Sequence, residues 1–122
     1  MLDNFRQYLI DQGLATATEV HANVCDGSDA CIVLWEYGGY KSPIGVTSSI
    51  SAVQIKVLDT DMSAARTKIN AIYDNLVDGK AFKLINNTKA NIFANTPPFY
   101  SGQDEQTRYS YIFNVNIVTE RN

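Results

Sequence analysis

The spacing of the apolar residues changes halfway through residues 50–79, ISAVQIKVLDTDMSAARTKINAIYDNLVDG, from every second residue to every third or fourth. In the first part, VQIKV, apolar and more polar residues alternate, which predicts a half-buried β-strand. From Met62 onward the apolar residues recur at spacings of three and four, which predicts an amphipathic helix at about 61–77. A strand that leads into such a helix requires a sheet on which the helix packs, so the fold must combine helix and sheet.

Acidic residues mark the point at which the period changes. Asp59, Thr60 and Asp61 lie immediately before the helical pattern. Their side-chain oxygens can accept hydrogen bonds from the first amides of a helix, and their charge suits its N-terminal dipole. Asp78 and Gly79 follow the last apolar position, and glycine readily takes the left-handed conformation that ends a helix. We therefore assign Asp59 and Asp61 to the helix start rather than to a reactive site.

The N-terminal third predicts one helix and two strands. Asp3 can cap a short amphipathic helix that ends at Gly13. Residues 20–24 alternate between apolar and polar, and the run CIVLWEY follows the turn DGSDA, so we interpret the two segments as a β-hairpin. The nearly continuous apolarity of CIVLWEY indicates a strand covered on both faces, either by a helix and a neighbouring molecule or by two layers of one chain. Residues 38–45 predict a flexible loop.

The C-terminal part predicts strands throughout. Residues 81–85 and 90–94 form short strands around a turn at 86–88, and TPPFY is extended because proline disfavours helix. Residues 109–118 alternate over a long strand with one aromatic face, which we expect to pack on the central helix. The predicted fold class is α+β: a single domain over residues 1–122, with a mostly antiparallel (mixed) sheet and both helices, N-terminal and central, on one face.

Composition excludes several classes of protein. A net charge of −3, with scattered lysines and arginines, argues against tight binding to phosphate backbones. No apolar run approaches the roughly 20 residues that span a bilayer. The N-terminal residues MLDNFRQYLIDQG also lack the basic and then apolar pattern of a signal peptide. We therefore expect synthesis in the cytoplasm and no membrane association.

No arrangement of residues indicates catalysis, a cofactor or a metal. His21 is the single histidine, and the acidic pairs Asp26/Asp29 and Asp104/Glu105 are explained by turns. Gly38 and Gly39 are not followed by the helix that a phosphate-binding loop needs. The two cysteines, Cys25 and Cys31, can approach each other across a turn, but in a reducing compartment we expect free, half-buried thiols. The protein is therefore not expected to be an enzyme.

The order of elements and three segments, VQIKV, AARTKINAIYDNL and PPFYSGQDEQTRYSYIFNVNI, resemble the minor capsid or tail-terminator (tail-completion) proteins of long-tailed bacteriophages. The resemblance covers most of the chain from about residue 35. One departure is Thr107, where the family pattern leads us to expect a glycine before the arginine. The residues that carry the resemblance are Val53, Gln54, Ile55, Val57, Ala65, Ile69, Tyr73, Leu76, Pro98, Tyr100, Gly102, Asp104, Glu105, Arg108, Tyr111 and Asn114.

The resemblance implies a structural subunit that closes into a homo-oligomeric ring, generally a hexamer, at the head-proximal end of the tail tube. The ring would end tube polymerisation, bind the major tail (tube) protein and a head-completion or connector protein, and let DNA pass without specific binding. It would assemble in the host cytoplasm and remain in the virion. A head-to-tail ring needs two unlike surfaces per subunit. We expect these in residues 38–45 and 102–108, with contacts from Tyr40, Lys41, Asp104, Glu105 and Arg108.

Two alternatives stay open at this point. The first is another head-tail connector or neck protein, which would bind the portal side first. The second is a small-ligand or peptide-binding module that uses the region around Trp35 and Tyr40.

Overall fold

A computed structural model describes residues 1–25, 27–41, 48–78, 82–94 and 96–120. These residues form two helices and a mixed sheet of seven strands, so the predicted α+β class is confirmed. The elements in chain order are α1 (Leu2–Asp11), β1 (Val20–Ala22), β2 (Ala30–Lys41), β3 (Ser48–Asp59), α2 (Met62–Leu76), β4 (Lys83–Ile85), β5 (Thr88–Ala94), β6 (Phe99–Gln103) and β7 (Tyr109–Glu120).

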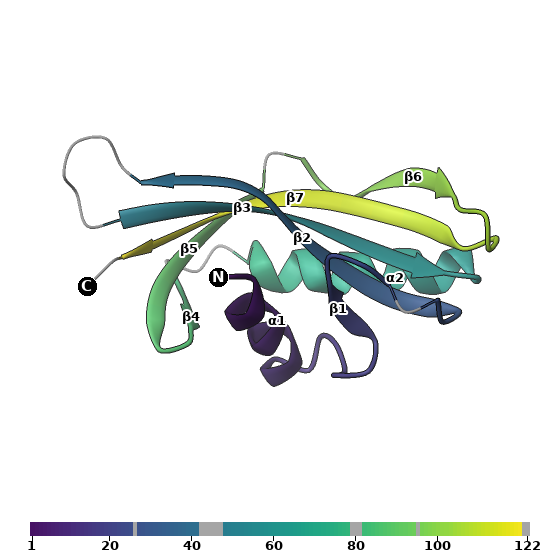
Figure 1. The fold of residues 1–122 in the computed structure, drawn as a ribbon, viewed down its shortest axis with the longest axis horizontal. Helices are drawn as coiled ribbons and strands as arrows, with labels where there is room; N and C mark the ends of the chain where they lie inside the picture. The colour runs from purple at the N-terminus through teal and green to yellow at the C-terminus, as the bar shows by residue number, and fades with distance from the viewer. Residues whose placement is uncertain (26, 42–47, 79–81, 95, 121–122) are drawn as a thin grey trace.

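The sheet is built around three strands of 12 residues each, β2, β3 and β7. The strand order is β1-β2-β3-β7-β5-β4, and β6 pairs with β7 on the same side as β5. Every pairing is antiparallel except that of β1 with β2. Both helices lie on one side of the sheet (Figure 1), as predicted: α2 packs on β3 and β7, and α1 packs near β1, β2 and β4.

The acidic residues at the start of α2 have the expected role. The side chain of Asp61 accepts a hydrogen bond from the backbone N–H of Ser63 at 3.0 Å, and Asp59 accepts from the N–H of Asp61 at 2.8 Å. The helix ends at Leu76. The predicted terminator Gly79 lies outside the described residues.

The start of α1 differs from the prediction. Its N-cap is Met1, and no side chain caps the helix, so the prediction that Asp3 does so is wrong. Asp3 instead lies in the first turn, where its charge still suits the helix dipole. Gly13 closes the helix as predicted, with φ of 72°, and the N–H of Leu14 donates to the carbonyl of Leu9 at 3.0 Å.

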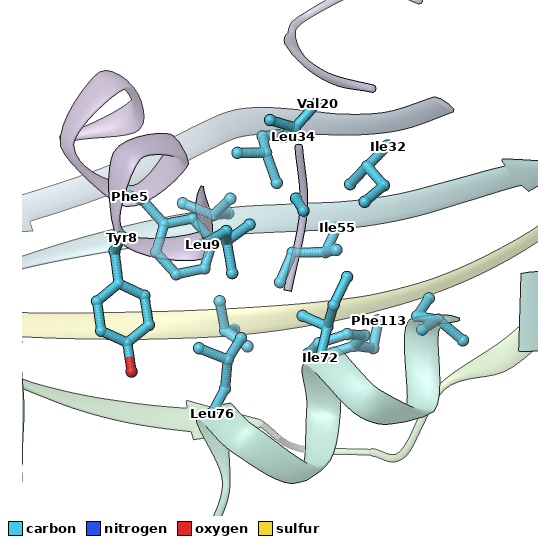
Figure 2. Close-up of a cluster of buried hydrophobic side chains, with 14 of the residues drawn as sticks. Phe5, Tyr8, Leu9, Val20, Ile32, Leu34, Ile55, Ile72, Leu76 and Phe113 are labelled. Atoms are coloured by element: carbon cyan, nitrogen blue, oxygen red, sulfur yellow. The ribbon is translucent and has the colours of Figure 1, made fainter. Parts of the chain in front are cut away.

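The hydrophobic core lies between the two helices and the sheet face that they cover. Figure 2 shows side chains of α1, α2 and the central strands converging there. The ring of Phe113 on β7 meets the edge of Tyr73 on α2, with 5.4 Å between centroids, which confirms the predicted packing of the last strand on the helix. The fully buried side chains of this cluster include Phe5, Leu9, Val20, Ile32, Leu34, Val53, Ile55, Ile69, Ile72, Phe113 and Ile117.

The first two strands do not form the predicted hairpin. β1 pairs with β2 in parallel, with Val20 opposite Ile32 and Ala22 opposite Leu34. The chain turns at Asn23, whose φ is 74° and whose N–H donates to the carbonyl of Leu34 at 2.8 Å. Alternation predicted two strands correctly, but it carries no information on strand direction.

The predicted loop at 38–45 is also partly wrong. β2 continues through Lys41, with Gly38 opposite Ala52 and Lys41 opposite Ser49. Pairing with a long neighbouring strand overrides the low strand propensity of two glycines, and a register shift between Glu36 and Gly38 accommodates them. Residues 42–47 lie outside the described residues.

The predicted strands around residues 86–88 are confirmed as β4 and β5, although Ala81 lies outside the described residues. Asn86 and Asn87 have φ of 52° and 62°, the left-handed pair that a two-residue hairpin turn requires. β5 and β6 follow one another along the same side of β7, with Ala94 opposite Val115 and Phe99 opposite Ile112.

Candidate subunit interface

The sheet face opposite the helices, which we call the open face, carries large exposed aromatic side chains. Trp35 is 51% exposed, Phe93 56% and Phe99 45%. Strand register places Trp35 opposite Gln54, Phe93 opposite Asn116 and Phe99 opposite Ile112, all on this face. The open face comprises Val33, Trp35, Ala52, Gln54, Lys56, Phe93, Phe99, Ile112, Asn114, Asn116 and Val118.

The open face mixes aromatic side chains with amides and one lysine, a composition typical of protein–protein contacts. Trp35 and Tyr37 lie 5.8 Å apart between ring centroids, so two exposed rings form one patch at the edge strand. The sequence indicated that CIVLWEY would be covered on both faces. In the single chain, Ile32 and Leu34 are buried beneath the helices, whereas Trp35 on the other face is exposed.

The sheet also has an open edge. β1 pairs only with residues Ile32, Val33 and Leu34 of β2. Beyond this point, from Trp35 to Lys41, β2 pairs with β3 on one side, and no described strand pairs with it on the other. An edge of this length presents backbone N–H and C=O groups to which another chain can add a strand.

Two of the predicted contact residues, Tyr40 and Lys41, lie at the end of this open edge. Their backbones pair with Ile50 and Ser49 of β3, and their side chains lie outside what the structure describes. The other three, Asp104, Glu105 and Arg108, lie in the turn between β6 and β7, at the opposite end of the long strands (Figure 1). The structure therefore separates the two predicted groups along the long axis of the molecule.

Asp104 organises the turn between β6 and β7. Its Oδ1 accepts hydrogen bonds from the backbone N–H of Gln106 at 3.0 Å and of Arg108 at 2.9 Å. The backbone N–H of Arg108, and then its guanidinium, hold the pKa of Asp104 below its ordinary value. Thr107 adopts φ of 60°, the left-handed conformation that the expected glycine would have taken. Glu105 is exposed in this turn.

Arg108 lies inside the subunit, only 8% exposed. Its Nη1 donates to the carbonyl of Ser28 at 2.9 Å and lies 2.9 Å from Sγ of Cys25. Arg108 thus joins the β6–β7 turn to the segment before β2. Any effect of Arg108 on a neighbouring subunit would act through the position of this turn.

Cys25 and Cys31 form a disulfide, so the expectation of free thiols is wrong, and the described part of the chain has no free cysteine. Their Cα atoms are 6.3 Å apart, within the range that a bridge allows. The turn at Asn23 and the contacts of Arg108 bring this segment back over the end of β2. The two cysteines are only 6 residues apart, and the expectation of free thiols was wrong because it depended on an assumed reducing compartment rather than on the local geometry.

Three grooves in the described part of the chain do not include Trp35 in their lining. A groove of about 280 Å³ lies between α1 and the β4–β5 turn, and its lining includes Asn4, Gln7 and Asn87. Trp35 does not line it. Among the described residues, no three histidine, cysteine or acidic side chains gather as a metal site would require. None of the helices described has the length and apolarity needed to cross a membrane.

Sequence reasoning did not identify Phe93 and Phe99 as candidate contact residues. The signal was present in ANIFA, where Ile92 and Phe93 occupy opposite faces of β5, with Ile92 partly buried and Phe93 exposed. Only the strand order shows that Phe93 and Phe99 share a face with Trp35.

A comparison with protein families finds one that covers most of the chain. The family model described as "Bacteriophage tail terminator protein" matches residues 8–121. No curated protein matches the chain.

Proposed function

Because this chain belongs to the bacteriophage tail terminator family, we propose that its copies close into a ring at the head-proximal end of the tail tube. The ring ends tube polymerisation and presents a surface to the head connector. The family is structural, and the subunit acts by contact rather than by turnover. A hexamer is the expected ring.

The unpaired edge of the sheet is the main observation that supports this proposal. The edge of β2 from Trp35 to Lys41 has no second strand partner among the described residues, and the open face beside it exposes Trp35. A neighbouring subunit that adds a strand at this edge would satisfy its backbone groups and cover the adjacent aromatic side chains. Both features favour association along the same side of the molecule.

The distribution of the contact candidates supports a head-to-tail arrangement. Tyr40 and Lys41 lie at one end of the long strands, and Asp104 and Glu105 lie at the other. Two unlike surfaces at opposite ends allow each subunit to bind the next, and a constant rotation between neighbours closes the ring. Lys41 and the acidic turn are also opposite in charge, which favours this pairing over two like ends.

The net charge of −3 agrees with passage of DNA through the ring without specific binding. The partners in this proposal are the major tail (tube) protein on one side and a head-completion or connector protein on the other. The ring forms in the host cytoplasm and remains in the virion. The family supports the virion location.

Electron microscopy and size-exclusion chromatography of purified protein test the proposal. Wild-type protein is expected to form rings of uniform diameter that bind the ends of tail tubes. Trp35→Glu places a charge on the open face and is expected to keep the subunit monomeric. Met62→Glu is the matched control, because Met62 is 40% exposed at the start of α2, on the side of the sheet away from the open face.

Wild-type protein that stays monomeric at high concentration, also when tail tubes are added, would contradict the proposal. Rings that bind a portal or connector but no tube would instead indicate a neck protein. Circular dichroism of both glutamate variants verifies that any loss of rings does not come from unfolding.

A further inference from the structure

The disulfide between Cys25 and Cys31 lies against a buried cation. Nη1 of Arg108 is 2.9 Å from Sγ of Cys25 and 3.7 Å from Sγ of Cys31. The two cysteines differ in exposure, because Cys25 is partly exposed whereas Cys31 is 1% exposed. A bridge with one reachable sulfur and one buried sulfur, both beside a guanidinium, differs from an inert structural disulfide in an apolar core.

The access of a small thiol to each cysteine determines which sulfur reacts first. Disulfides exchange when a thiolate attacks one sulfur and the other leaves as a thiolate. A small thiol can reach Cys25, and the leaving sulfur is then that of Cys31. The guanidinium of Arg108 stabilises negative charge at this leaving sulfur, and positive charge beside a cysteine favours its thiolate form.

Ser28 and Asp29, which lie between the two cysteines, have contacts that do not depend on the disulfide. Arg108 donates to the carbonyl of Ser28 at 2.9 Å, and Asp104 holds the same guanidinium at 2.8 Å. The N–H of Thr60 donates to the carbonyl of Asp29 at 3.2 Å. These hydrogen bonds keep residues 28 and 29 on the sheet when the bridge opens, so exchange does not require unfolding.

We propose that Cys25 and Cys31 form a reversible exchange site for low-molecular-weight thiols, with Cys25 as the sulfur attacked and Arg108 as the positioning residue that stabilises the thiolates. A small thiolate attacks Sγ of Cys25, the bond between Cys25 and Cys31 breaks, and its electron pair remains on Cys31, which takes a proton from water. A second small thiolate attacks the mixed disulfide. It releases the small disulfide and leaves Cys25 as a thiol.

In the balanced reaction one protein disulfide is reduced to two thiols and two small thiols are oxidised to one disulfide. The reverse reaction, driven by a small disulfide, closes the bridge. The exchange chemistry does not depend on the proposed function.

Reaction of purified full-length protein with a chromogenic aromatic disulfide tests the assignment of the two sulfurs. In Cys31→Ser the single thiol is Cys25, and in Cys25→Ser it is Cys31. Cys25 is expected to react at least about ten times faster, because exchange requires access. In wild-type protein treated with reduced glutathione, mass spectrometry of peptides is expected to find the mixed disulfide on Cys25. Equal rates, or glutathione on Cys31, would overturn the assignment.

The role of Arg108 is tested in the Cys31→Ser background. Arg108→Gln is expected to raise the pH of half-maximal reactivity. At pH 7 the variant is expected to react about three-fold more slowly, because it forms less thiolate and the higher nucleophilicity of that thiolate offsets only part of the loss. Arg108→Lys keeps the cation and is expected to restore most of the effect. Arg66→Gln removes the same charge from an exposed site on α2 and is expected to change neither quantity.

An unchanged pH profile in Arg108→Gln would overturn the role of Arg108. If that variant does not fold, the Arg108→Lys profile decides the question: a profile that matches the Cys31→Ser parent supports the cation, and one that differs contradicts it. These rates are measured without tubes, and the reaction does not require ring formation. A failure here therefore does not bear on the proposed ring, and a failure to form rings does not bear on the exchange site.

Discussion

Nε and Nη2 of Arg108 both lie 2.8 Å from the same oxygen, Oδ2, of Asp104. The other oxygen of Asp104 accepts two backbone N–H groups, including that of Arg108. One carboxylate therefore fixes the backbone of the β6–β7 turn and the side chain that reaches across to Ser28. This pair determines where the acidic turn stands relative to the rest of the subunit.

Replacing Arg108 by methionine is expected to destabilise the subunit by about 1–3 kcal/mol. The substitution removes charge-assisted hydrogen bonds and leaves the carbonyl of Ser28 without this donor. Urea denaturation with the disulfide intact measures the change. Arg66→Met, on the exposed surface of α2, should remain within about 0.5 kcal/mol of wild type, and equal losses in the two variants would contradict the role given to Arg108.

Asp104 makes stability depend on acid pH. Its pKa is lowered in the folded state, so the folded protein binds fewer protons than the unfolded chain as the pH falls toward 3.8, the ordinary pKa of an aspartate side chain. The stabilisation is present in full above that pH and disappears as the pH falls through the lowered pKa. The difference in urea midpoint between wild type and Asp104→Asn should therefore shrink between pH 6 and pH 2.5. A difference that stays constant with pH would exclude this linkage.

Thr107 is strained by its left-handed backbone, with φ of 60°. Branched residues rarely adopt this conformation, whereas asparagine tolerates it. Thr107→Asn is expected to raise the free energy of unfolding by about 0.5–1 kcal/mol, reduced in part by loss of the hydroxyl bond to the carbonyl of Gln106. Thr67→Asn, at an exposed position within α2, serves as the comparison in thermal melts and should show no gain.

The parts of the fold that a local pattern determines were predictable from the sequence. The helical period and the acidic residues before it predicted α2, and the alternation over residues 109–118 predicted most of β7. Strand direction was not predictable, because parallel and antiparallel strands show the same alternation. The parallel pairing of Val20 with Ile32 could therefore not be recognised. The strand at Gly38 was not predictable either, because a neighbouring strand overrides propensity there.

The candidate site was predictable only in part, for a related reason. The sequence identified Asp104 as a turn residue, and the turn geometry agrees. It gave no sign that Arg108 is buried, because Ser28 and Cys25 lie 80 and 83 residues away in the chain. The open face likewise exists only once β5, β6 and β2 are placed in one sheet.

The cap of α2 is expected to contribute about 1 kcal/mol to stability. Asp61→Ala removes the acceptor of the Ser63 N–H and leaves that amide to water. Chemical denaturation should detect the loss, and Asp61→Asn should retain most of the stability because asparagine is also a good cap. Asp74→Ala, exposed in the last turns of the same helix, controls for the loss of one negative charge. An equal cost at both positions would show that charge, not capping, is responsible.

The two faces of the sheet are expected to respond differently to the loss of an aromatic ring. Phe113 is fully buried and meets Tyr73 on α2, so Phe113→Ala should cost about 3–5 kcal/mol in the free energy of unfolding. Phe99 is 45% exposed on the open face, so Phe99→Ala should cost less than about 1 kcal/mol in the monomer while it weakens self-association. Denaturation at low protein concentration and sedimentation at high concentration separate the two effects. If Phe99→Ala leaves self-association unchanged, the interface must lie at the open edge of β2 alone; if it destabilises the monomer as much as Phe113→Ala, another part of the same chain covers this face.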